Sequence, residues 1–223
     1  GGSEKNQNRT SFGYSRQLGD AKGNNLSQFT VASNTTVRLW EQLTVNMTVN
    51  GSMRKVDGFA YGVDPFSYAY NTSRVIPCYN EDGPLLYHEK SGRNSDAVQG
   101  KTTYNYNILN EQAHTGSENN TRTWGATFDL RWLLFGDLEY QGMFSYSSSS
   151  SDSKKYATER SYYISEIRGY EYGSVAPNSV ETISTPLPMG GLLETDLTNV
   201  STITTRNALV YNKTFNLKHR ITL

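Results

Sequence analysis

Apolar and polar residues alternate along several stretches of this chain, as they do in a β-strand with one apolar face. The clearest alternation covers residues 123–132, where every second side chain is apolar or aromatic. A period of two predicts a strand whose two faces meet different surroundings. The sequence predicts about seven such segments in all. They are residues 9–16, 29–39, 43–49, 123–132, 138–146, 203–210 and 215–223.

The connections between these segments differ greatly in length. Short turns are predicted at residues 40–42, 133–137 and 211–213. Residues 53–121 and 147–200 contain no comparable alternation and are predicted as long loops, with a shorter loop at 17–26 on the same rim. Short turns on one rim and long loops on the other are typical of a transmembrane β-barrel. We therefore predict an all-β fold, an antiparallel transmembrane β-barrel segment with short periplasmic turns and long extracellular loops, although the mean hydropathy resembles that of a soluble protein.

The long loops contain signals for local structure. Asp64 and the proline after it form a helix cap with a first-turn proline, which predicts a helix over residues 66–71. The helical spacing of side chains between residues 156 and 167 predicts a second helix that stops at Gly169. The serine-rich run 147–153 predicts a flexible, solvated junction between strand and loop.

Aromatic residues mark the ends of the predicted strands. Trp40, Trp132 and Tyr211 fall at or beside the short turns, where one interfacial girdle of a barrel belongs. Trp124 lies on the same strand face as Trp132, ~26 Å along the strand and ~20 Å along a tilted membrane normal. This separation roughly matches the ~25 Å apolar band of such barrels, so these four aromatics are predicted to contact outer-membrane lipid. A soluble β-sandwich with core aromatics is the alternative interpretation.

Length and composition limit the possibilities further. A chain of 223 residues predicts one domain, and a net charge of +0 provides no electrostatic footprint for nucleic acid. The single cysteine, Cys78, excludes an intrachain disulfide framework and a cysteine metal site. No apolar run approaches the length of a transmembrane helix. Single-chain bacterial barrels have even strand counts, so we expect this chain to be a piece of a larger protein that lacks its signal peptide here.

Several loop segments carry a family resemblance. They are YAYNTSRVIPCYNEDG at 68–83, YNILNE at 106–111, ATERS at 157–161, IRGYE at 167–171 and LPMGG at 187–191, with GGSEK at 1–5 before the first strand. In this order and spacing the chain resembles, over essentially its whole length, the barrel domain of the SusC/RagA family of TonB-dependent outer-membrane transporters.

The resemblance implies a barrel of ~22 strands with an N-terminal plug, located in the outer membrane of a Gram-negative bacterium and driven by the TonB complex. It also implies a SusD/RagB-like surface lipoprotein that caps the barrel and delivers a bulky nutrient, usually an oligosaccharide and sometimes a peptide. The plug and the TonB-contacting segment are not found among these 223 residues. We therefore expect that the fragment alone does not transport.

The long loops supply candidate contacts for substrate or partner. A tyrosine ring packs well on a sugar face while its hydroxyl forms hydrogen bonds, and arginine pairs with carboxylates such as Glu81, Asp82 or Glu159 to tie loops together. Alternatively, most of the tyrosines pack loop against loop. The candidates are Tyr68, Arg74, Tyr79, Asp82, Arg160, Arg168 and Tyr170. The predicted lumen face offers Thr44, Asn46, Thr48, Thr127, Asp129, Arg131, Glu139 and Gln141, which suit a neutral, hydroxylated solute.

No residue pattern indicates catalysis, a metal site or a cofactor. Glycoside hydrolysis needs two carboxyl groups ~5–9 Å apart across a sugar, and sequence neighbours such as Glu81 and Asp82 rarely face one cleft. Residues 80–83 are better interpreted as a turn. The rival to transport is a secreted all-β carbohydrate-binding or adhesin module, followed by a carbohydrate-active enzyme. A soluble module stays monomeric without detergent, whereas a barrel fragment exposes apolar faces and strand edges and aggregates.

Overall fold

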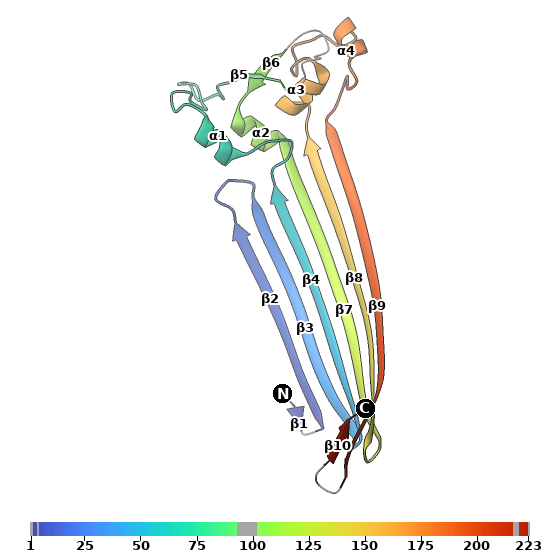
Figure 1. Cartoon of the computed structure of the whole chain (residues 1–223). Helices are drawn as coiled ribbons and strands as arrows, with labels where there is room; N and C mark the ends of the chain where they lie inside the picture. Colours follow the sequence, from blue (N-terminus) through green and yellow to red (C-terminus); the bar gives the residue numbers. More distant parts are fainter. Residues whose placement is uncertain (1, 4, 93–101, 216–218, 223) are drawn as a thin grey trace.

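The chain forms one tall antiparallel sheet with a group of short elements at one end (Figure 1). The computed structural model describes residues 2–3, 5–92, 102–215 and 219–222. The strand order in the main sheet is β1-β2-β3-β4-β7-β8-β9-β10. The strands are β1 (Gly2–Ser3), β2 (Asn6–Leu18), β3 (Asn25–Trp40), β4 (Leu43–Gly58), β7 (Thr115–Phe135), β8 (Leu138–Ala157), β9 (Leu192–Phe215) and β10 (His219–Thr222).

The prediction of an antiparallel all-β fold is confirmed. Six of the predicted segments lie wholly within strands of this sheet. Of the seventh, 215–223, residue 215 ends β9 and residues 219–222 form β10, while 216–218 and 223 lie outside the described residues. The two-residue β1 is an addition. The six long strands pair over most of their length, for example from Asn6 opposite Val37 to Leu18 opposite Asn25 between β2 and β3. The sheet is open within this chain, since β1 and β10 lie at its two ends.

The strands extend well beyond the predicted alternation, which corrects the loop boundaries. β4 runs to Gly58 and β7 starts at Thr115, so the first long loop covers 59–114 and not 53–121. β8 runs to Ala157 and β9 starts at Leu192, so the second covers 158–191 and not 147–200. Both faces are mostly polar over these extensions, with isolated apolar side chains such as Leu193 and Leu197, so the regular alternation ends while backbone pairing continues.

Two smaller predictions about these strands were wrong. The serine-rich run 147–153 is not a flexible junction, because it pairs with β7 on one side and β9 on the other. Its hydroxyls also face those of the neighbouring strand, with Ser151 Oγ 3.4 Å from Thr121 Oγ1. Residues 211–213 are not a turn, since β9 continues to Phe215. The connection to β10 lies at 216–218, outside the described residues.

Four short helices and a two-stranded sheet fill the long loops. The bounds are α1 (Pro65–Asn71), α2 (Ile108–His114), α3 (Tyr162–Arg168), α4 (Val180–Ser184), β5 (His88–Ser91) and β6 (Thr103–Tyr106). The predicted cap of α1 is confirmed, because Asp64 Oδ1 accepts the backbone N–H groups of Phe66 and Ser67 at 3.0 Å each. α3 stops at Gly169 as predicted, with φ 82°, but it starts at Tyr162, because residue 156 still belongs to β8.

The register gives the main sheet one apolar and one polar face. Met47 pairs with Phe128, and Phe128 pairs with Phe144, so the three side chains lie in one row on the apolar face. Phe128 and Phe144 are 44% and 46% exposed. The predicted lumen residues all lie on the opposite face, where Arg131 Nε donates to Glu139 Oε1 at 2.7 Å. Thus the sheet itself holds almost no buried core.

Candidate functional site

The long loops fold together at the end of the sheet; residues 59–92, 102–114 and 158–191 are called the loop cluster below (Figure 1). It covers the polar side of the sheet. Thr115 and Ala157 pair on that side and are each 2% exposed, whereas Tyr156 and Leu193, on the other face at this level, are 42% and 64% exposed. Ser117 Oγ donates to the Phe59 carbonyl at 3.2 Å on the same polar side. The loops therefore lean over the face that is predicted to line a lumen.

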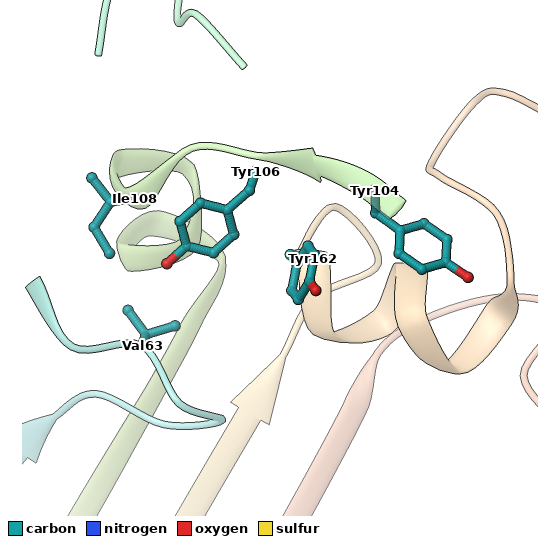
Figure 2. Packing of buried hydrophobic residues seen from close by; sticks show 5 residues of the cluster. All are labelled: Val63, Tyr104, Tyr106, Ile108 and Tyr162. Atoms are coloured by element: carbon teal, nitrogen blue, oxygen red, sulfur yellow. The ribbon is translucent and has the colours of Figure 1, made fainter. Parts of the chain in front are cut away.

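Tyrosine rings build the core of the loop cluster. Tyr162, at the start of α3, meets Tyr104 and Tyr106 of β6 edge to face, with ring centroids 6.2 and 5.3 Å apart (Figure 2). Lys90 Nζ lies 3.9 Å from the centroid of Tyr106. Burial raises the pKa of Tyr106 far above its usual value, so its hydroxyl stays protonated. These contacts join the two long loops into one packed unit.

A buried carboxylate, Glu111 of α2, binds the start of α3. Glu111 is 1% exposed, and its two carboxylate oxygens accept the backbone N–H of Tyr162 at 3.0 and 2.9 Å. Asn110 Nδ2 donates to Glu111 Oε1 at 2.9 Å and to the Arg160 carbonyl at 3.0 Å. Burial raises the pKa of Glu111, while these donors oppose that rise. The sequence contained Glu111 in its YNILNE segment, but no spacing pointed to a partner 51 residues away.

Asn107 ties a further part of the first loop to α2. Its Oδ1 accepts the backbone N–H of Leu109 at 2.9 Å and so caps the helix. Its Nδ2 donates to the carbonyls of Cys78 and Leu86 at 2.8 and 2.7 Å. One buried amide therefore both starts the helix and holds the strand-like segment around residues 78–86.

Arg168 and Tyr170, two predicted contact residues, are buried. Arg168 is 3% exposed and donates to the carbonyls of Leu187 and Gly190 at 3.1 and 2.5 Å. Its Nη2 also lies 3.5 Å from Glu159 Oε2. The Tyr170 hydroxyl donates to the Pro188 carbonyl at 3.1 Å. Both residues hold the 187–190 segment in place and offer little surface to a ligand.

The other predicted contact residues of the first loop are dispersed. Tyr68 packs on Tyr106 with ring centroids 5.6 Å apart, Tyr79 is 55% exposed, and Arg74 and Asp82 are exposed. Arg74 makes no ion pair with any residue that the structure describes, so its predicted pairing with Glu81 or Asp82 does not occur there. The turn interpretation of 80–83 is confirmed by a 3.0 Å hydrogen bond from Gly83 N to the Asn80 carbonyl.

One hollow in the loop cluster, called the loop cleft below, has a volume of about 310 Å³. Arg160 lies at this cleft with its guanidinium carbon 5.0 Å from the ring centroid of Tyr172. Glu171 accepts the backbone N–H and the side-chain amide of Asn105, both at 2.9 Å. The lining residues are Tyr87, Asn105, Asn110, His114, Arg160, Tyr162, Ser165, Glu171 and Tyr172. Of the predicted contact residues, only Arg160 belongs to the cleft.

Arg160 is the positively charged group in the described lining of the loop cleft, because the other basic side chain there, His114, is neutral. Burial and the nearby Arg160 lower the pKa of His114, so its ring is neutral at pH 7. The His114 Nδ1 lies 2.9 Å from the Thr158 hydroxyl. The Tyr87 hydroxyl donates to Asn110 Oδ1 at 3.2 Å. The cleft thus presents a guanidinium, two accessible tyrosine rings and several polar groups.

The predicted interface aromatics lie away from the loop cluster, on the apolar face of the sheet. Trp40 is 68%, Trp124 52% and Trp132 43% exposed. Trp40 pairs with Leu43, which pairs with Trp132 on its other side, and Tyr211 pairs with Leu138 beside the turn at 136–137. The four aromatics share one face, and their contact with lipid stays a prediction.

Nothing in the described part of the chain indicates a metal centre. No three of its His, Cys, Asp and Glu side chains gather closely enough to hold a metal ion. None of the described helices combines the length and the apolar character needed to cross a membrane.

The sequence matches no model of a known protein family and no curated protein.

Proposed function

We propose that this chain forms part of the wall and outer vestibule of a TonB-dependent transporter of the SusC/RagA type. The whole protein takes up a bulky nutrient, an oligosaccharide, across the outer membrane together with a SusD/RagB-like lipoprotein. The observation that carries this proposal is the pair of opposite faces of the sheet. One face of the sheet exposes rows of apolar side chains such as Phe128 and Phe144, and the opposite face is polar and hydrogen-bonded. Strands that separate lipid from an aqueous lumen have this pattern.

The slope of the apolar band supports a membrane. The upper edge of the band in each strand is the last apolar residue before a polar residue on the same face. In β3 this residue is Phe29, because Ser27 comes next on that face. In β8 it is Tyr146, because Ser148 comes next. Phe29 pairs with Met53 of β4. Tyr146 pairs with Ala126 of β7, which pairs with Val49 of β4. The edge therefore descends by four residues, ~13 Å, between β3 and β8, and it is level between β2 and β3 and between β8 and β9. Over the five strand spacings from β2 to β9, ~24 Å, the mean slope is ~30°, which is close to the strand tilt of ~35–45° in membrane barrels.

The upper parts of the strands fit an outer vestibule. β7 continues from Trp124 up to Thr115, ~30 Å beyond the apolar band. Over this length the polar face is lined by hydroxyls, such as Thr123 Oγ1 at 3.4 Å from Ser149 Oγ. The loop cluster closes over the same face. Such a wall suits a hydroxylated solute that is received above the membrane and passed down a polar face.

Cysteine labelling of the full-length protein in its own outer membrane tests the proposal. In a Cys78→Ser background, Phe128→Cys places a thiol on the apolar face of the sheet, and Thr127→Cys places one on the polar face at the adjacent position. We expect a lipid-soluble maleimide to label the first and a water-soluble maleimide to label the second. Loss of oligosaccharide uptake on deleting the gene, or the gene for TonB, completes the test.

A secreted carbohydrate-binding module predicts a different result. A water-soluble maleimide would then label both positions on a protein that stays monomeric without detergent, and the transport proposal would be abandoned.

A further inference from the structure

We propose that the loop cleft binds a carboxylated sugar residue, a uronic acid, whose carboxylate pairs with Arg160 while its ring packs against the tyrosine side chains of the cleft. This inference rests on the proposed uptake of an oligosaccharide and specifies the chemistry that the vestibule selects. It differs from the sequence-based expectation of a neutral solute, which was drawn from the polar face of the sheet.

The first argument is a guanidinium that lies beside an aromatic ring and has no acidic partner among the described residues. Arg160 is exposed, and it makes no ion pair with a residue in the described ranges. Its backbone is anchored, because its carbonyl accepts the Asn110 amide at 3.0 Å, and its guanidinium carbon lies 5.0 Å from the ring centroid of Tyr172. A guanidinium offers two parallel N–H donors that match a carboxylate.

The second argument concerns Glu171, the one carboxylate among the described residues that line the cleft. Both of its oxygens accept hydrogen bonds from Asn105, at 2.9 Å each. It is therefore turned toward β6, and no ion pair joins it to Arg160 among the described contacts. The positive charge of Arg160 stays available to an anionic ligand.

The third argument is the absence of aliphatic side chains from the described lining of the loop cleft, which consists of tyrosine, histidine, amide, hydroxyl and charged groups. Several common modes of peptide recognition use an apolar groove or a free strand edge. A sugar ring needs an aromatic surface and dispersed polar groups, and Tyr87 and Tyr172 are 43% and 49% exposed. The volume, about 310 Å³, is at the lower end for ligand sites and suits a short part of a longer glycan.

Titration calorimetry on the full-length transporter with its lipoprotein tests the inference. The probes are trisaccharides of galacturonic, glucuronic and mannuronic acid, each compared with its methyl ester, which has the same rings without the charge. We expect at least one acid to bind about 10- to 100-fold more tightly than its own ester. Arg160→Gln removes this preference, and Arg160→Lys restores part of it. Arg74→Gln is the matched control, since Arg74 is exposed on the first loop outside the cleft.

Three results overturn the inference. In the first, no acid is preferred to its ester. In the second, Arg160→Gln leaves the preference intact. In the third, a glutamate tripeptide binds with the same dependence on Arg160, which assigns the cleft to acidic peptides. The proposed function fails separately, because a transporter of neutral glycans still passes the labelling and uptake tests, whereas a soluble module fails these tests even if its cleft binds a uronic acid.

Discussion

The main sheet and the loop cluster are built on opposite principles. Apart from Leu43 and Ala157, the buried apolar side chains in the described ranges belong to the loop cluster, although the sheet contains the longest elements. The sheet is held by backbone ladders and by side-chain hydrogen bonds on one face, and no described element of the chain covers its apolar face. The loop cluster has its own core of tyrosines and a buried carboxylate. The sheet thus depends on its surroundings, while the loop cluster depends on internal contacts.

Glu111→Ala should have the largest effect, because it should destabilise the loop cluster while leaving the sheet intact. The change leaves the backbone N–H of Tyr162 and the Asn110 amide without their buried acceptor, which costs about 3–5 kcal/mol of loop-cluster stability. We expect limited proteolysis of the intact protein to cleave both long loops while the sheet stays resistant. Glu81→Ala, in an exposed turn, is the control and should change nothing.

A charge on the apolar face tests the sheet. Phe128→Lys places an ammonium in the middle of the apolar band and should cost about 2–4 kcal/mol if that band faces lipid. Thr127→Lys, one position along on the polar face, should cost far less. The measurement is the denaturant midpoint of the full-length protein refolded into bilayers. Equal midpoints for the two variants would argue against a lipid-facing band.

Arg168→Ala tests how firmly the second loop is held. It removes the donors to the Leu187 and Gly190 carbonyls, and we expect a loss of about 2–3 kcal/mol that is confined to residues 187–191. Hydrogen exchange should rise in that segment, and co-purification of the lipoprotein should fall. If exchange and co-purification both match those of the wild type, Arg168 does not organise this surface.

The helix cap of α1 should have a smaller effect. Asp64→Ala removes the acceptor for the N–H groups of Phe66 and Ser67 and should cost about 1 kcal/mol, with faster exchange in α1 only. Asp64→Asn keeps the side-chain oxygen and should behave nearly as the wild type. A similar loss in both variants would show that the charge and not the cap matters.

The last expected effect is a pH dependence of loop-cluster stability that comes from Glu111. Because burial raises the pKa of this carboxyl in the folded state, the fold binds the proton more tightly than the unfolded chain does. Stability of the loop cluster therefore falls as pH rises from the usual glutamate value through the raised one, by at most about 1.4 kcal/mol per pH unit. Hydrogen exchange of α2 and α3 at pH 5 and 7 measures the slope. Glu111→Gln should lose this slope, and an unchanged slope would assign it to other groups.

The sequence predicted local features well where one residue acts on its neighbours. The cap at Asp64, the stop at Gly169 and the turn at 80–83 depend on backbone groups within a few residues. Alternation also placed the strands through the apolar band. It did not detect their upper halves, because a strand that is polar on both faces has no period to detect, and only pairing partners reveal it.

The candidate site was predicted only in part for the same reason. Arg160 was expected to contact substrate or partner, and the structure brings it to the loop cleft. Nothing in the sequence spacing of Tyr87 and Tyr172 indicated that they meet Asn105 at one cleft. Arg168 and Tyr170 carried the same signal as Arg160 and are buried. Residue type alone does not distinguish an arginine that binds carbonyls internally from one that faces solvent.

The sequence by itself determined the class of the fold, the two unlike faces of the sheet and the inequality of turns and loops, because these follow from short-range periodicity and turn chemistry. Only the tertiary structure decided how far the strands extend, which polar side the loops cover and which distant residues meet. The bond from Tyr162 N to Glu111 and the meeting of Arg160 with Asn110 join separate loops. Such contacts depend on how two long segments fold back on one another, and no local pattern records that path.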